Sequence, residues 1–225
     1  PKVLEASSEK KITARCMMDY VDVVQEELVE GMEQEEHEDA HSHEGESGEI
    51  EYDEHIWTSP VNAQKIVEEI RKALSEVDPE NSQEYDKNAK EYIEKLQVLD
   101  QEIKETVNSG VRKELIFGDR FPLRYFTDEY GLAYRAAFPG CSADTEPSAD
   151  TIAYLIDQVK QDKIPVVLTI ELSSVKVAET IAESTGAQVM TFYSCHNVTK
   201  KQFDEGISYL EMMEENIEVL KKALA

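Results

Sequence analysis

The sequence predicts an α/β fold in which a parallel sheet carries helices on both faces. Four short β-rich segments alternate with helical segments after Gly110, which is typical of a parallel sheet with helical crossovers. Residues 59–109 show helical spacing of apolar side chains over a long stretch. The composition agrees, because 40% of the 225 residues are hydrophobic, and such a chain can bury a substantial core.

Residues 1–58 are interpreted as the last part of a preceding α/β lobe. They predict the end of a helix, a short strand near Lys11–Arg15 and a turn at Met17–Val24, with Cys16 as a small buried residue. The chain starts at Pro1 rather than Met, and we expect it to have been processed or cut from a longer protein. Residues 26–54 hold 14 Asp or Glu residues, three of the five histidines and no Lys or Arg. We interpret this tract as a mobile acidic loop.

Residues 59–109 predict two helices. Ser59 is a favourable N-cap and Pro60 suits the first helical position. The sequence around Pro79 ends the first helix, and a second is predicted from about Pro79 to Val107. This second helix would be roughly 40 Å long at 1.5 Å per residue. Such a length suits a linker between two lobes, although one more helix of a bundle would look the same.

Residues 110–225 predict a second α/β lobe. We expect strands at Glu114–Phe117, Leu132–Phe138, Val166–Ile170 and Gln188–Phe192. We expect helices at Pro122–Tyr130, Ala149–Asp162, Ser174–Thr185 and Gly206–Leu224.

The charge and the missing motifs exclude several classes of function. The chain has 23 Lys and Arg against 48 Asp and Glu, a formal net charge of −25, which repels nucleic acid and anionic lipid. It has no apolar run of about 18 residues that would predict a membrane helix. It contains neither of the Gly-rich phosphate-binding motifs and no Gly-x-Ser-x-Gly nucleophile elbow.

Polar side chains follow the predicted strands at the sheet edge where ligands bind in open parallel sheets. Asp119 follows the first strand, Glu171 the third and His196 the fourth, and His55 is a further candidate for the same edge. Imidazole nitrogen and carboxylate oxygen are good zinc ligands, so these four residues predict a metal site. Each also has a purely structural alternative, such as a helix cap for Asp119 or an ion pair for Glu171.

Two further groups of residues have alternative interpretations. His37, His41 and His43 lie in the acidic tract, where they form either a metal-collecting arm or part of a solubilising linker. Cys141 and Cys195 follow two strands at the same edge. We expect them to form a disulfide, although two reduced thiols or a thiolate metal ligand are the alternatives.

Several motifs in order resemble the zinc/manganese ABC-transporter solute-binding proteins. Tyr52-Asp-Glu-His-Ile-Trp-Thr-Ser-Pro-Val-Asn-Ala63 resembles their Asp-Pro-His-x-Trp-x-Ser/Asp-Pro-x-Asn-Ala signature. The His-bearing acidic tract precedes it, as in zinc-specific members. Residues 138–148 are similar to their Pro-Gly-x-Ser-x-x-x-Glu-Pro-Ser loop, and the likeness runs from about residue 12 to the end.

The resemblance implies ligand roles for some positions and departs at others. His55 matches the metal-coordinating histidine of the signature, and His196 falls in a late loop that supplies another ligand. In residues 117–121, Gly118 stands where a third family histidine is expected, so Asp119, Glu171 or water would have to compensate. An early histidine from the first lobe is also expected in the family and does not occur in this chain.

The function implied by the resemblance is non-enzymatic capture of Zn²⁺ outside the cytoplasmic membrane and its delivery to an ABC permease. The protein would be periplasmic, or held at the outer face of the membrane by a lipid anchor absent from this chain. Imidazole favours Zn²⁺ over Mn²⁺, which prefers oxygen ligands. The alternatives are a zinc hydrolase with Glu171 as general base, and an acidic metal-buffering or adhesion protein derived from the same family.

Overall fold

The computed structural model describes residues 13–33, 52–140 and 146–225. A parallel four-stranded sheet in the order β2-β1-β3-β4 forms its centre. The strands are β1 (Glu114–Phe121), β2 (Ala133–Pro139), β3 (Val166–Thr169) and β4 (Gln188–Thr191). The predicted α/β class with a parallel sheet is therefore confirmed.

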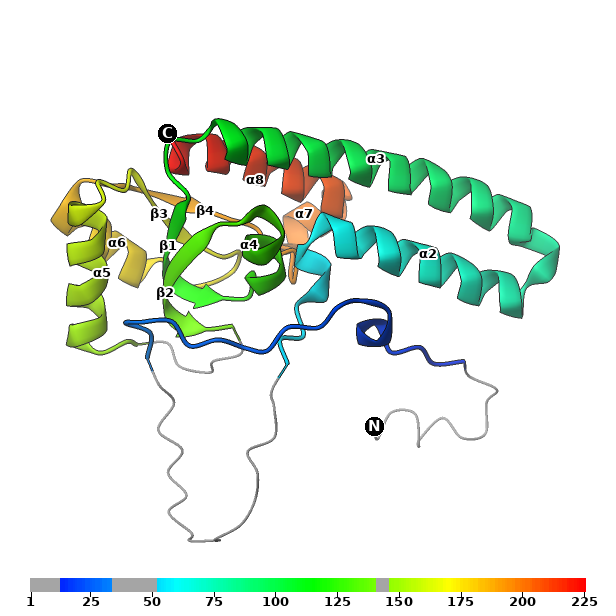
Figure 1. The fold of residues 1–225 in the computed structure, drawn as a ribbon, viewed down its shortest axis with the longest axis horizontal. Coiled ribbons are helices and arrows are strands. Elements are labelled where there is room, and N and C mark those ends of the chain that lie inside the picture. Colours follow the sequence, from blue (N-terminus) through cyan, green and yellow to red (C-terminus); the bar gives the residue numbers. More distant parts are fainter. Residues whose placement is uncertain (1–12, 34–51, 141–145) are drawn as a thin grey trace, which may run out of the picture.

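The helices lie on both faces of this sheet and extend beyond it (Figure 1). They are α2 (Pro60–Val77), α3 (Ser82–Ser109), α4 (Arg124–Tyr130), α5 (Ala149–Gln161), α6 (Lys176–Thr185), α7 (Lys200–Glu205) and α8 (Tyr209–Ala223). Short 3-10 helices η1 (Met17–Tyr20), η2 (Ile56–Thr58) and η3 (Pro79–Asn81) complete the described elements.

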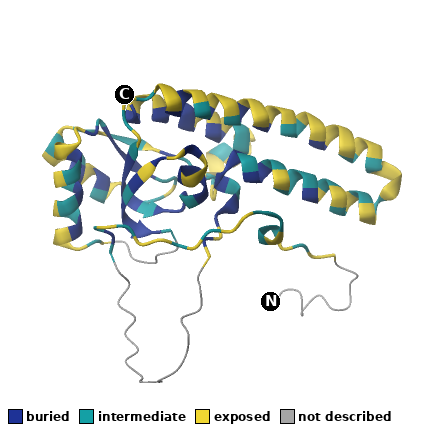
Figure 2. Cartoon of the chain, viewed as in Figure 1, coloured by how far each residue is buried: buried dark blue, intermediate teal, exposed yellow. Residues whose placement is uncertain are grey.

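Buried residues concentrate in the sheet and along the inner sides of the helices (Figure 2), and their apolar side chains form two clusters. Neighbouring residues of β1 point to opposite faces, as the pleat of a strand requires. Phe117 packs in the cluster that contains residues of α3 and α8, such as Leu96 and Leu220. Ile116 packs in the cluster that contains residues of α5 and α6.

Helices α2 and α3 form an antiparallel pair that projects from the sheet (Figure 1). The Ser59 hydroxyl accepts a hydrogen bond from the backbone N–H of Asn62, and Pro60 occupies the first turn, as the sequence predicts. The α2 helix ends before Asp78, and α3 then packs along α8. The site segment 53–58 thus leads directly into a long, rigid helical pair.

Three local predictions are wrong. Residues 13–15 of the expected early strand are not a strand, and Cys16 is exposed rather than buried. Strand β1 continues to Phe121, past the predicted end, through a β-bulge between Phe117 and Arg120. The last predicted helix, Gly206–Leu224, corresponds to α8, whereas α7 lies before it, begins with a capping box of Thr199 and Gln202, and is not among the predicted helices.

The acidic tract is fixed at the ends that the structure describes. Gln25 forms an isolated antiparallel bridge with Tyr52, and the Glu33 N–H donates to the Ala137 carbonyl at the end of β2. Met32 is buried. The expectation of mobility therefore does not apply to residues 26–33, and residues 34–51 lie outside the described residues.

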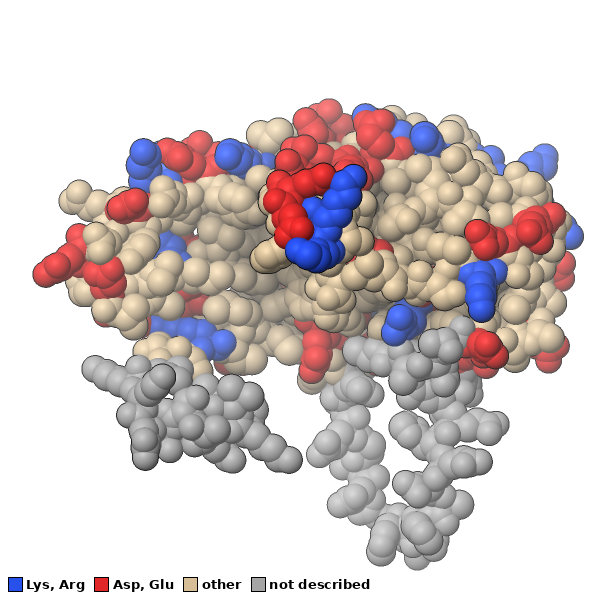
Figure 3. Space-filling model, turned by 180° about the vertical axis from the view of Figure 1, so that it is seen from behind, with Lys and Arg blue, Asp and Glu red and all other residues tan. Residues whose placement is uncertain are grey.

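Charged side chains cover the outer faces of the helices. On the face seen from behind, acidic and basic side chains are interspersed (Figure 3). Many of the Lys and Arg residues pair with carboxylates on the same helix, as Lys200 does with Asp204 and Arg124 with Asp128. Among the described residues, no helix combines the length and the apolar character needed to cross a membrane.

Candidate metal centre

A cavity of about 380 Å³ lies at the carboxyl edge of the sheet. The segment before η2 and the ends and following loops of β1, β2, β3 and β4 all contribute to its wall. Its lining residues are Glu54, His55, Arg120, Pro122, Gly140, Ile170, Glu171, Leu172, Ser194, His196 and Asn197. The predicted site thus lies at the expected edge, and three of its four predicted ligands line one cavity.

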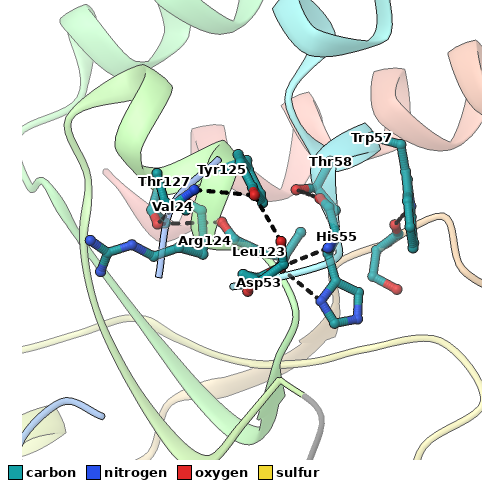
Figure 4. Close-up of polar contacts among 10 residues, drawn as sticks. Val24, Asp53, His55, Trp57, Thr58, Leu123, Arg124, Tyr125 and Thr127 are labelled. Atoms are coloured by element: carbon teal, nitrogen blue, oxygen red, sulfur yellow. Dashed lines mark hydrogen bonds and ion pairs between the residues drawn. The ribbon is translucent and has the colours of Figure 1, made fainter. Parts of the chain in front are cut away.

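His55 is buried and its ring is held by Asp53. The imidazole Nδ1 lies 3.0 Å from Asp53 Oδ1, and the same oxygen accepts a 2.7 Å hydrogen bond from the His55 backbone N–H. Because a carboxylate oxygen only accepts, this contact places the ring proton on Nδ1. The lone pair of Nε2 then points away from Asp53 (Figure 4), and a neutral imidazole in this state can bind a metal ion.

Asp53 is itself fixed by hydrogen bonds to two distant segments. The Tyr125 hydroxyl donates to the Asp53 carbonyl at 2.7 Å and accepts from the Val24 N–H at 3.3 Å (Figure 4). The Asp53 N–H donates to the Val24 carbonyl at 3.0 Å. Burial raises the pKa of Tyr125, so this hydroxyl keeps its proton. The position of His55 is therefore set before any ligand binds.

His196 lines the same cavity as His55. The centroids of the two imidazole rings are 6.0 Å apart, and each lies 5.5–5.6 Å from the ring of Trp57. The indole N–H of Trp57 donates to the Ser194 carbonyl at 3.0 Å. The only tryptophan of the chain thus ties the His55 segment to the loop that carries His196.

The Glu171 carboxylate is occupied by hydrogen bonds from the loop after β4. It accepts from the Ser194 hydroxyl and N–H and from the His196 N–H, each at 2.8 Å, and from the Asn197 N–H at 3.2 Å. Cys195, within this loop, adopts a positive φ of 59°, a conformation that costs energy for a residue with a side chain. Glu171 therefore holds a strained turn that presents His196.

The Asp119 carboxylate also has a structural role and does not line the cavity. It accepts from the Ile170 N–H at 3.0 Å, the Ser173 hydroxyl at 2.8 Å and the Arg120 N–H at 2.8 Å. These contacts connect the bulge of β1 to the loop after β3. The ligand role of Asp119 stays a prediction without geometric support.

The predicted set of four ligands does not come together as one group. Within the described ranges, no three or more His, Cys, Asp or Glu side chains are placed so that they could hold a metal ion. Zinc takes about four ligands, and the two neighbouring imidazoles would provide two of them. The ligand assignments of His55, His196 and Glu171 therefore stay predictions, with the first two favoured by their geometry.

The equivalence of Gly118 with a family histidine stays a prediction. A Cβ atom on Gly118 would lie 2.6–2.9 Å from three atoms of Ala178, so this position faces α6 and not the cavity. The residue of this segment that does line the cavity is Arg120.

The predicted accessory residues are only partly described. His37, His41 and His43 lie outside the described residues, as does Cys141. Cys195 carries a free thiol in the structure, and burial together with the charge of Glu171 raises its pKa. The metal-collecting arm and the disulfide stay predictions.

Sequence reasoning missed Asp53 and Arg120. Asp53 could have been found from the sequence, because an Asp side chain can accept a hydrogen bond from the backbone N–H two residues later, here that of His55. Arg120 could not have been found in this way, because the sequence of β1 does not indicate the bulge that precedes this residue.

Comparison with known proteins identifies the family. The model of the ZnuA family, described as zinc-uptake complex component A, periplasmic, matches residues 1–223. The chain therefore belongs to the ZnuA family.

Individual relatives agree with this assignment. The chain is 37% identical over 172 residues to the high-affinity zinc uptake system protein ZnuA of Bacillus subtilis, covering 76% of this chain and 53% of that protein. It is 34% identical over 223 residues to the zinc-binding lipoprotein AdcA of Streptococcus pneumoniae, covering 99% of this chain and 42% of that protein. The chain thus spans about half the length of these relatives.

A solved structure agrees with the fold. The crystal structure of Zn(II)-bound AdcA from Streptococcus pneumoniae aligns with a TM-score of 0.74 at 29% identity, covering 100% of this chain and 44% of that one. The parallel-sheet lobe predicted from the sequence is therefore a fold of this family.

Proposed function

We propose that the protein binds Zn²⁺ as the cargo of an uptake system and passes it to an ABC permease. The observation that carries this proposal is the pair of His55 and His196, whose ring centroids lie 6.0 Å apart and which line the same cavity. One of them is held by a carboxylate on its second nitrogen, which is how metal-binding histidines are usually oriented. Family membership makes zinc the first candidate for the ion.

The ligand roles follow from these contacts. His55 contributes Nε2 and His196 contributes a ring nitrogen, while Glu171 and Asp119 shape the loops on which the site depends. The remaining coordination positions need further ligands. The early histidine expected from the resemblance is one source for them.

The division of the chain follows the same proposal. Residues 1–58 belong to a first lobe, residues 59–109 supply the helical connection and residues 110–225 form the second lobe. The site then lies at the boundary, because His55 precedes the helices and His196 belongs to the second lobe. Location outside the cytoplasmic membrane is proposed from the periplasmic family description and from AdcA, a lipoprotein.

A hydrolytic function is not supported by the contacts of Glu171. A general base needs a free lone pair within reach of a water molecule, whereas both Glu171 oxygens already accept hydrogen bonds from residues 194–197. The metal-buffering or adhesion alternative has no observation in its favour among these contacts.

Metal analysis of the purified protein, followed by calorimetric titration with Zn²⁺ and Mn²⁺, tests the proposal. We expect zinc in the purified protein and a tight zinc equivalent that Mn²⁺ does not displace at equal concentration. Binding of neither metal, or a clear preference for Mn²⁺, would contradict a zinc carrier.

A further inference from the structure

Three aromatic rings form a group beside the cavity. Trp57 lies next to His55 (Figure 4), with 5.5 Å between the ring centroids. The centroids of Trp57 and His196 are 5.6 Å apart, and those of the two imidazoles are 6.0 Å apart. Separations of about 4.5–7 Å are typical of aromatic rings in contact. The indole therefore contacts both of the histidines that are proposed to bind zinc.

Trp57 is itself held by hydrogen bonds to two other parts of the fold. Its indole N–H donates to the Ser194 carbonyl at 3.0 Å, in the loop after β4. The Tyr209 hydroxyl, at the start of α8, donates to the Trp57 carbonyl at 2.9 Å. Ser194 is buried, and its N–H and hydroxyl both donate to Glu171. Trp57 thus joins the segment before α2 to the loop after β4 by contacts that are fixed on both sides.

The two imidazoles differ in how their positions are set. His55 is buried, and its ring is held by Asp53. His196 is exposed, and its ring contacts those of His55 and Trp57. Asp53 therefore fixes one ring, and Trp57 relates the position of the other ring to it.

The separation of the imidazoles affects which coordination geometry the site accepts. Zinc binds imidazole nitrogen at about 2.0–2.1 Å and prefers a tetrahedron, which places the centroids of two bound imidazoles about 5 Å apart. Neighbouring ligands of an octahedral ion such as Mn²⁺ meet at a smaller angle, which brings the two centroids about 0.5 Å closer together. The observed 6.0 Å is nearer to the tetrahedral separation.

We propose that Trp57 is a positioning residue that sets the separation of the two imidazoles, and that it thereby favours tetrahedral Zn²⁺ over octahedral Mn²⁺. This inference rests on the proposed function and names a residue that determines the specificity of its site. A site discriminates between geometries when its ligands are held to within about 0.5 Å. The hydrogen bonds on both sides of Trp57 supply this restraint.

Calorimetric titration of the metal-free chain and of Trp57→Ala with Zn²⁺ and Mn²⁺ tests the inference. We expect the zinc affinity of the variant to fall at least tenfold and its manganese affinity to stay unchanged or rise. Trp57→Phe, which keeps a ring but not the N–H, should give a smaller change in the same direction. Phe203→Ala is the matched control, since Phe203 is exposed and does not line the cavity.

Co²⁺ in place of Zn²⁺ gives a readout of geometry that a loss of stability alone does not change. Tetrahedral Co²⁺ absorbs visible light much more strongly than octahedral Co²⁺. The unchanged chain should show the strong absorption, and Trp57→Ala should show weaker absorption per bound ion. Circular dichroism checks the fold, and Trp57→Phe is the decisive variant if Trp57→Ala is unfolded.

The outcomes separate this inference from the proposed function. If the folded Trp57 variants bind zinc with the same ratio of affinities and the same Co²⁺ spectrum as the unchanged chain, the inference alone is overturned. Equal losses of affinity for both metals also overturn it, because they indicate a general loss of structure. A chain that binds no zinc under any condition overturns the proposed function as well.

Discussion

The imidazole Nδ1 of His55 lies 3.0 Å from the Oδ1 atom of Asp53, and both side chains are buried. This contact fixes the tautomer and the direction of the ring, so that Nε2 remains available as a ligand. The geometry of the proposed zinc site therefore depends on a residue that does not itself line the cavity.

Asp53→Asn should weaken zinc binding about 10- to 100-fold, the usual cost of losing the carboxylate partner of a metal-binding histidine. The amide oxygen can still accept from the His55 N–H, so the local fold should persist. Calorimetric titration measures the loss. Asp22→Asn is the control, because Asp22 is an exposed carboxylate whose ion-pair partner, Lys65, is also on the surface. Equal affinities of Asp53→Asn and the control would remove Asp53 from the site.

Glu171→Gln should destabilise the metal-free protein by about 1–3 kcal/mol, the cost of leaving buried donors unsatisfied. The amide presents one acceptor oxygen, whereas the carboxylate uses both of its oxygens for residues 194–197. Zinc binding should weaken as His196 loses its fixed position. Glu179→Gln, on the exposed face of α6, is the control.

Denaturant unfolding without metal distinguishes the two roles of Glu171. A positioning residue lowers the free energy of unfolding of the metal-free protein when it is replaced. An effect that appears only in the presence of zinc would instead identify Glu171 as a ligand.

Gly118→Ala should lower stability by about 1–3 kcal/mol, as expected for overpacking in a tight core. The added Cβ would lie 2.6 Å and 2.7 Å from backbone atoms of Ala178, which cannot move without shifting α6. Zinc affinity should not change, because the position faces away from the cavity. Thermal unfolding and zinc titration of the same variant test both parts. A changed affinity with unchanged stability would restore Gly118 to the site.

The two described cysteines should differ in reactivity after reduction of the protein. Burial raises the pKa of Cys195, so little thiolate forms at pH 8, and the thiolate is the reactive species. Cys16 is exposed and should be alkylated by iodoacetamide at least tenfold faster. Mass spectrometry of a labelling time course gives both rates. Similar rates in the folded protein would mean that the loop around Cys195 opens readily.

The architecture was predictable because each element has a local signal. The Ser59-Pro60 start of α2 and the alternation of β-rich and helical segments depend on periodicity and capping, which act within a few residues. The location of the cavity was predictable because the carboxyl ends of parallel strands lie at the same edge of the sheet, where ligands bind. His55 and His196, on different segments, were expected at that edge and do lie there.

The rest depended on contacts that sequence spacing does not contain. The bulge before Arg120 has no local signal in the sequence, and the buried carboxylate of Asp119 connects it to a loop about 50 residues away. The carboxylates of Asp119 and Glu171 are residue types that bind metal, but here they accept hydrogen bonds from backbone groups. Polar residues that follow the strands therefore indicate where a site lies, but they do not indicate whether each side chain binds a ligand or holds a loop.

The zinc affinity of His55→Ala and His196→Ala, measured by competition with a chromophoric chelator, tests the central claim most directly. His41→Ala is the matched control, since it removes a histidine of the acidic tract. We predict that the zinc affinity of each site variant falls at least tenfold, about 1.4 kcal/mol. The control variant should still bind one zinc ion with the affinity of the unchanged chain. Tight binding that is unchanged in both site variants would contradict a zinc site built on His55 and His196.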